Sequence, residues 1–158
     1  MANEPQAIIN MIQQVNAEIT GVRFSPTFDK YPLTADSVRL PMVLTWPGGS
    51  NIWKRDNFAS KKRVDGIYEV LVFCEALGQN TLPGRSQLAT TLLGAFREKW
   101  LSVDANGYPT ALSNAGTHQV TVEFDGTYPQ DSGIQPNLQV GAVAYAGFTI
   151  QLKIRELW

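Results

Sequence analysis

Residues 4–20 carry apolar side chains at the spacing of one helical face. The apolar positions recur at intervals of three, four and seven residues, which matches the period of an α-helix. Asn3 and Pro5 are suited to begin such a helix, and Gly21 is suited to end it. The segment 24–36 has two prolines and no regular period, so we expect an irregular connection there. The predicted buried stripe of the helix consists of Ile8, Ile9, Ile12, Val15 and Ile19.

Two strands are expected next, joined by a long tip. Pro41 cannot donate a ladder hydrogen bond, which indicates that the first strand lies at a sheet edge or contains a bulge. Residues 66–77 are apolar at both odd and even positions, which is typical of a central strand. We predict a hairpin whose tip holds residues 47–49 and 51–64. The first strand is expected to present one apolar side, formed by Val38, Leu40, Met42, Leu44 and Trp46.

A second helix is predicted within residues 84–104. Ser86 is placed to cap its N-terminus, and Arg97 and Lys99 lie favourably near its C-terminus. Apolar residues recur there every four positions, which is again the spacing of a buried helical stripe. The predicted stripe consists of Leu88, Leu92, Phe96 and Trp100.

The C-terminal part is predicted to contain two strands separated by a loop over 127–137. In residues 118–126, Val120, Val122 and Phe124 alternate with polar residues. Residues 147–156 show the most regular alternation of the chain, with one face for the core and one for solvent. The expected core face is Phe148, Ile150, Leu152 and Ile154, and the expected polar face is Thr149, Gln151, Lys153 and Arg155.

The order helix, long-tipped hairpin, helix, strand, loop, strand predicts an α+β fold. We expect a mixed, mainly antiparallel β-sheet with both amphipathic helices packed on one face, since each helix must bury its apolar stripe. A chain of 158 residues fits one domain, so residues 1–158 are assigned to a single domain.

The composition limits the classes of partner. Charged residues make up 17% of the chain, compared with about 25% in a typical soluble domain. Either a partner covers part of the surface, because interface cores are poor in charge, or uncharged polar residues keep the protein soluble. The net charge of −1 argues against a general nucleic-acid binder.

The single cysteine, Cys74, excludes an internal disulfide and fits a reducing compartment. The N-terminus contains Glu4 and no basic segment before its apolar positions, so it does not resemble a secretion signal. No apolar run approaches the roughly 20 residues that span a bilayer. We therefore expect no membrane partner.

Candidate residues for catalysis or metal binding are few. His118 could activate Cys74, but no pattern brings the two together, and a packed thiol is the simpler interpretation. Glu123 and Asp125 are spaced like a catalytic carboxylate pair, although such a pair is more often solvated. The glycines of 47–49 lack the lysine and the context of a phosphate-binding loop. We predict no enzyme, no catalytic residue, no metal site and no cofactor.

Residues 51–64 hold five of the thirteen positive charges. This basic run could bind nucleic acid, an anionic membrane or an acidic protein, or it could be a solvated loop tip. No nucleic-acid reading module surrounds it, and the glycines before it disfavour an amphipathic membrane helix. We favour a protruding arm that docks an acidic neighbour. The candidate subunit or tail-docking interface is Trp53, Lys54, Arg55, Phe58, Lys61, Lys62 and Arg63.

The order of elements resembles that of the tail terminator proteins of long-tailed bacteriophages, which are related to the minor tail protein U type. The resemblance covers most of the chain. It rests on the helix 7–19, the hairpin leading into 68–77, the helix 88–100 and the closing strand 147–156.

The resemblance implies a structural virion protein in the neck region of the tail, assembled in the host cytoplasm. Such proteins form a homohexameric ring that caps the tail tube, stops its polymerisation and offers a joining surface for the head-tail connector or head-closure protein. The implied partners are other copies of the chain, the tail tube protein and the connector, with DNA passing through the ring without sequence-specific binding. The alternatives are a head-closure protein, a tail tube subunit or, less favoured, a small hydrolase that uses Glu123 and Asp125.

Overall fold

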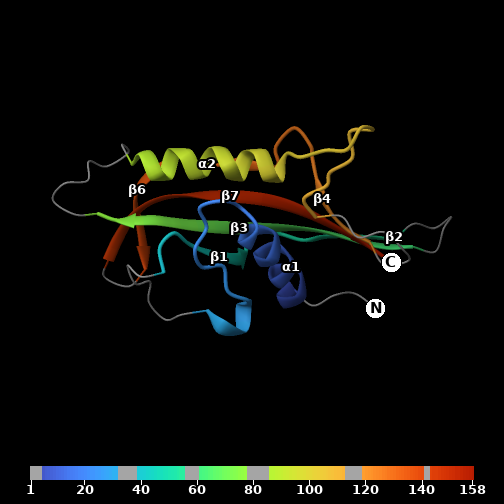
Figure 1. The fold of residues 1–158 in the computed structure, drawn as a ribbon. Coiled ribbons are helices and arrows are strands. Elements are labelled where there is room, and N and C mark those ends of the chain that lie inside the picture. Colours follow the sequence, from blue (N-terminus) through green and yellow to red (C-terminus); the bar gives the residue numbers. More distant parts are fainter. Residues whose placement is uncertain (1–4, 32–38, 56–60, 78–85, 113–118, 141–142) are drawn as a thin grey trace.

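The computed structural model describes residues 5–31, 39–55, 61–77, 86–112, 119–140 and 143–158. Within them it contains two α-helices, one 3₁₀ helix and a seven-stranded sheet, which confirms the predicted α+β class (Figure 1). The helices are α1 (Pro5–Ala17), η1 (Phe28–Lys30) and α2 (Gln87–Trp100). The strands are β1 (Met42–Pro47), β2 (Ile52–Arg55), β3 (Lys62–Ala76), β4 (Gln119–Glu123), β5 (Gln130–Asp131), β6 (Gln135–Val140) and β7 (Val143–Leu157).

The sheet is organised around β3 and β7, two antiparallel strands of 15 residues each. β1 and β2 pair with one side of β3, and β4, β5 and β6 pair with the far side of β7. β3 is therefore a central strand, as its apolar residues on both parities predict. After β1 the chain stops pairing with β3, and it pairs with β3 again as β2. The β2–β3 hairpin extends past one end of the helix-covered region (Figure 1).

Both α-helices pack on the same face of the sheet. Alternate residues of β3, from Tyr68 to Cys74, join alternate residues of β7 and the buried faces of both helices in one core cluster. Ser86 caps α2 by accepting a 3.1 Å hydrogen bond from the backbone N–H of Ala89, as predicted. All five residues of the predicted α1 stripe, and the four apolar residues predicted for β7, belong to this core.

The opposite face of the sheet has a smaller core at the end where β1 and β6 lie. It consists of Leu40, Met42, Leu44, Phe73, Leu138 and Tyr145 and is covered in part by Phe24 and Tyr31. β1 is therefore buried on both faces, because Val43 faces the helices and belongs to the main core. Leu40, Met42 and Leu44 share one face as predicted, but the expectation that only this face is apolar was wrong. Trp46 is 41% exposed, and Val38 lies outside the described residues.

Two further expectations are corrected. Leu88 is 42% exposed, and the stripe that α2 buries passes instead through Ala89, Leu92, Leu93, Phe96 and Trp100. A strict spacing of four drifts off the buried face because a helix has about 3.6 residues per turn. The predicted loop 127–137 contains β5 and the start of β6. β6 pairs with β7 close to Gly147, where an added Cβ would overlap the Val72 carbonyl.

Candidate interaction surface on the hairpin

β2 places the predicted interface residues on an exposed edge of the sheet. Trp53 lies opposite Val64, Lys54 opposite Arg63, and Arg55 opposite Lys62. All four residues of β2 are exposed, and the Trp53 side chain reaches 80%. A strand without a covered face contributes little to the core, so these side chains are available for contact with another molecule.

The last residue of the chain completes this surface. Trp158 exchanges two backbone hydrogen bonds with Lys62, of 2.8 and 3.0 Å. A shallow hollow of about 330 Å³ results, lined by the apolar side chains of Trp53, Val64 and Trp158. The basic residues Lys54, Arg55, Lys62 and Arg63 also line it. We call these seven residues the tip surface.

The structure therefore brings together five of the seven predicted interface residues. Lys61 is exposed directly before β3, and Phe58 lies outside the described residues. Val64 and Trp158 were not predicted. Trp158 has the same parity as the core residues of β7, but Glu156 interrupts the apolar alternation after Ile154, so the alternation did not indicate its position.

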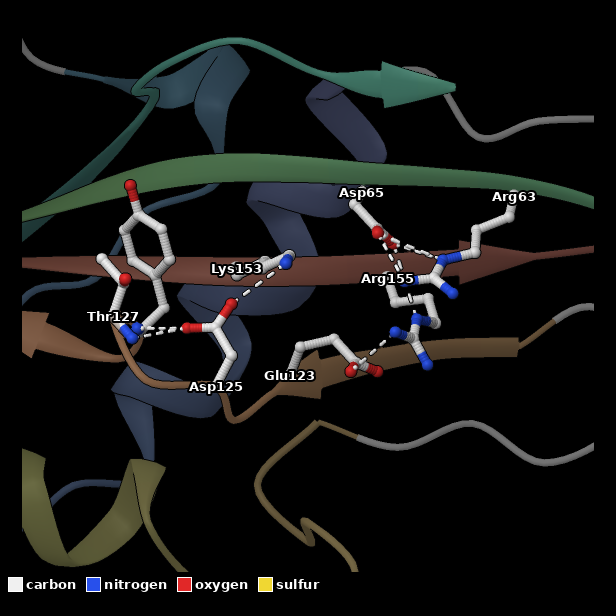
Figure 2. Close-up of polar contacts among 8 residues, drawn as sticks. Arg63, Asp65, Glu123, Asp125, Thr127, Lys153 and Arg155 are labelled. Atoms are coloured by element: carbon white, nitrogen blue, oxygen red, sulfur yellow. Dashed lines mark hydrogen bonds and ion pairs between the residues drawn. The ribbon is translucent and has the colours of Figure 1, made fainter. Parts of the chain in front are cut away.

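Arg63 differs from its basic neighbours because it is held in an ion pair. Its Nη2 lies 2.6 Å from Oδ2 of Asp65, and its Nε donates a 2.9 Å hydrogen bond to Oδ1 (Figure 2). Asp65 is 4% exposed, and its burial pushes its pKa upward. The hydrogen bond from Arg63 and the charges of Arg63, Arg155 and Lys153 outweigh this effect, so the pKa of Asp65 is lowered. Arg63 therefore has a structural role in addition to its place on the tip surface.

The ion pairs continue across the sheet face that the helices leave uncovered. Arg155 lies between Asp65, at 3.5 Å, and Glu123, at 3.0 Å, while Lys153 contacts Asp125 at 3.0 Å (Figure 2). Three cations and three carboxylates thus balance within this group. The network joins β3, β7 and the end of β4 and fixes their side chains.

The candidate carboxylate pair is divided between two cations. Glu123 binds Arg155, whereas Asp125 binds Lys153 and accepts backbone hydrogen bonds from Tyr128 and Thr127. These backbone bonds, followed by the bond from Lys153, lower the pKa of Asp125 to about 2. A carboxylate that is ionised at such low pH is a poor general acid.

The other candidate chemistry involves Cys74 and His118. Cys74 is buried, and burial raises the pKa of its thiol to about 12, so almost no nucleophilic thiolate forms near neutral pH. His118 lies outside the described residues. Among the described residues, no group of three or more His, Cys, Asp and Glu side chains could hold a metal ion.

The comparisons with known proteins give no family assignment, because no family model and no curated protein matches the chain. The helices in the described part of the chain are too short or too polar to cross a membrane.

Proposed function

We propose that the chain is a structural virion protein that forms a ring on the phage tail tube, ends its polymerisation and offers the head-joining surface. The observation that carries this proposal is the β2–β3 hairpin, which extends beyond the helix-covered core and exposes Trp53 among basic residues. Large exposed aromatic side chains are typical anchors of protein interfaces.

The chemistry of the described residues supports a binding role better than catalysis. The candidate carboxylates Glu123 and Asp125 are held in ion pairs, and the Cys74 thiol is buried with its pKa raised to about 12. The hollows on the described surface are small or shallow, whereas enzyme pockets enclose most of a small substrate. A protein whose task is assembly needs only complementary surfaces.

The order of elements that resembles tail terminators directs the proposal to the tail. The ring is expected to contact the tail tube protein on one side and the connector or head-closure protein on the other, in the neck of the virion. DNA would pass through the ring without sequence-specific contacts.

The test measures assembly and tail length together. Mass measurements across protein concentrations, with electron microscopy of the largest species, are expected to show closed rings, most simply hexamers. Added to polymerising phage tail tube protein, the chain should give tubes with a cap at one end that elongate no further. Tube protein alone is the control.

Three outcomes would reject the proposal. A protein that stays monomeric at every concentration, even with tail tubes, has no ring to form. Open-ended tubes made of the chain itself would identify a tube subunit. Hydrolytic activity that disappears in a Glu123→Gln/Asp125→Asn variant would identify an enzyme.

A further inference from the structure

The charges of the chain are divided unevenly between the hairpin tip and the rest of the molecule. Residues 51–64 contain five of the 13 cationic residues and one of the 14 acidic residues, a local balance of +4. The remaining residues contain eight cationic and thirteen acidic ones, a balance of −5. A second copy of the chain is therefore itself an electrostatically complementary partner for the tip.

One exposed acidic residue lies at the C-terminal end of each α-helix. Glu18 follows α1, and Glu98 lies in the last turn of α2. Both line a shallow hollow of about 380 Å³ together with Ile19 and Ala95. Lys99 also lines it and pairs with Glu18 at 2.9 Å, so these three charged residues together carry one net negative charge.

Two further features make this surface complementary to the tip. The C-terminal end of a helix carries a partial negative charge, and the last turn of α1 contains no basic residue to offset it. Leu101 and Val103, which follow α2, are each about half exposed. We call Glu18, Ile19, Ala95, Glu98, Leu101 and Val103 the helix-end surface.

We propose that the tip surface of one copy docks on the helix-end surface of the next copy. Trp53 would contribute the apolar anchor, with Arg55 and Lys62, which share its face of the hairpin, facing Glu18 and Glu98. The two surfaces are different parts of the same molecule, so the contact is heterologous and each copy uses one surface on each neighbour. This inference deepens the proposed function by naming the faces that would join ring subunits.

The test uses two variants that each remove one side of the contact. The tip variant is Trp53→Ser/Lys62→Ser, and the helix-end variant is Glu18→Gln/Glu98→Gln/Leu101→Ser. Each alone should associate with itself at least about tenfold more weakly than the parent. Mixed in equal amounts, they retain one intact contact and should form a 1:1 heterodimer and nothing larger. Sedimentation equilibrium measures both results, alone and on tail tubes.

The control for the tip variant is Arg23→Ser/Lys30→Ser, which also removes positive charge. The control for the helix-end variant is Asp29→Asn, which also removes negative charge. These exposed residues lie outside both surfaces, so the control variants should assemble like the parent. Thermal melting of every variant separates a lost contact from a lost fold.

Several results would overturn the docking inference. The mixture could stay monomeric although both variants are folded. The variants could assemble like the parent, or the parent could fail to associate at any concentration. Closed rings formed equally well by all variants would leave the proposed function in place and reject only this contact. Open chains of the parent that both variants abolish would keep the contact and reject the terminator.

Discussion

The side-chain Nε2 of Gln13 lies 2.8 Å from the carbonyl oxygen of Val43, so a glutamine on the buried face of α1 is hydrogen-bonded to β1. The same nitrogen donates to the carbonyl of Pro26 at 2.9 Å. The side-chain Oε1 of Gln13 accepts hydrogen bonds from Thr45 Oγ1 at 2.7 Å and from Asn16 Nδ2 at 3.3 Å. A fully buried amide is thereby completely paired, as burial of a polar group requires.

The network extends to the second helix. Trp100 Nε1 donates a 3.0 Å hydrogen bond to Asn16 Oδ1, which joins α2 to α1. Because the bonds have fixed directions, they specify how the two helices and the edge strand sit relative to one another, whereas apolar contacts alone are less directional.

The first prediction replaces Gln13 by Leu. The change leaves the buried carbonyl of Val43 and the hydroxyl of Thr45 without this partner, and each unpaired group costs about 1–3 kcal/mol. The free energy of unfolding should fall by at least about 2 kcal/mol in a denaturant titration. Gln14→Leu, on the exposed side of the same helix, is the matched control and should be nearly neutral. Equal stability of the two variants would contradict this role of Gln13.

The outer edge of β1 is also closed by the protein itself. Val43 N–H donates to the carbonyl of Phe24 at 2.9 Å, and Thr45 N–H donates to Tyr31 Oη at 2.7 Å. Tyr31 Oη in turn donates to the carbonyl of Thr45 at 2.9 Å, and Pro47 has no N–H. An edge with its donors occupied cannot readily accept another strand, so we expect association through side-chain surfaces rather than through extension of the sheet at β1.

The second prediction concerns the core face of β7. Ile150 and Leu152 are buried against the helices, and each large-to-small change costs roughly 2–5 kcal/mol out of a total stability of about 5–15. The Ile150→Ala/Leu152→Ala protein should be unfolded or melt far below the parent. Thr149→Ala/Gln151→Ala, on the other face of the same strand, should melt within a few degrees of it. A core double variant that melts like the parent would contradict the packing described above.

How much of the fold could be predicted depended on the regularity of the pattern. The stripe from Ile8 to Ile19 and the alternation from Phe148 to Ile154 each follow one period, so both were predicted correctly. Gln13 was missed because polarity was taken to indicate exposure, although it lies four residues after Ile9 on the same helical face. β6 was missed because Pro136 and its polar neighbours resemble a loop.

The candidate site was predictable only in part. The basic run indicated the tip, but its charge pattern alone does not distinguish Arg63, which pairs with Asp65, from the exposed Lys62 beside it. That difference depends on which side chains share a sheet face. The carboxylates Glu123 and Asp125 likewise required the register of β4 against β7 before their cationic partners could be identified.

The third prediction separates Arg63 from Lys62. Arg63→Gln removes the main partner of a buried carboxylate and should lower the free energy of unfolding by about 1–3 kcal/mol, as expected for a charged group that loses its hydrogen bonds. Lys62→Gln, at the adjacent exposed position, should change it by less than about 0.5 kcal/mol. A denaturant titration of both proteins at neutral pH makes the comparison. If the two changes have the same effect, the Arg63–Asp65 pair does not stabilise the fold.

The fourth prediction is the pH dependence of that difference. The pKa of Asp65 is lower in the folded protein than in the unfolded chain, where it is about 3.9. The pair therefore contributes its full stability above the unfolded pKa and loses it as the pH falls through the folded value. The stability gap between the parent and Arg63→Gln should be constant from pH 7 to about pH 5 and should shrink below about pH 4. If the stability gap instead widens as the pH falls, the pKa of Asp65 is not lowered in the folded protein, and the assignment is wrong.

The last prediction tests whether the exposed basic residues act in docking rather than in folding. Lys61→Glu/Lys62→Glu reverses two exposed charges and leaves Arg63 and its pair intact. Exposed charges contribute little to stability, so the melting temperature should change by no more than about 2 °C. Ring formation or attachment to tails should weaken, and the parent's own assembly should weaken as salt is raised, because ions screen complementary charges. The matched control, Arg23→Glu/Lys30→Glu, should assemble normally. If the tip variant also assembles normally and retains DNA like the parent, the tip is only a solvated hairpin. If it assembles normally but loses salt-sensitive retention of DNA, the positive charges of the tip face the lumen of the ring.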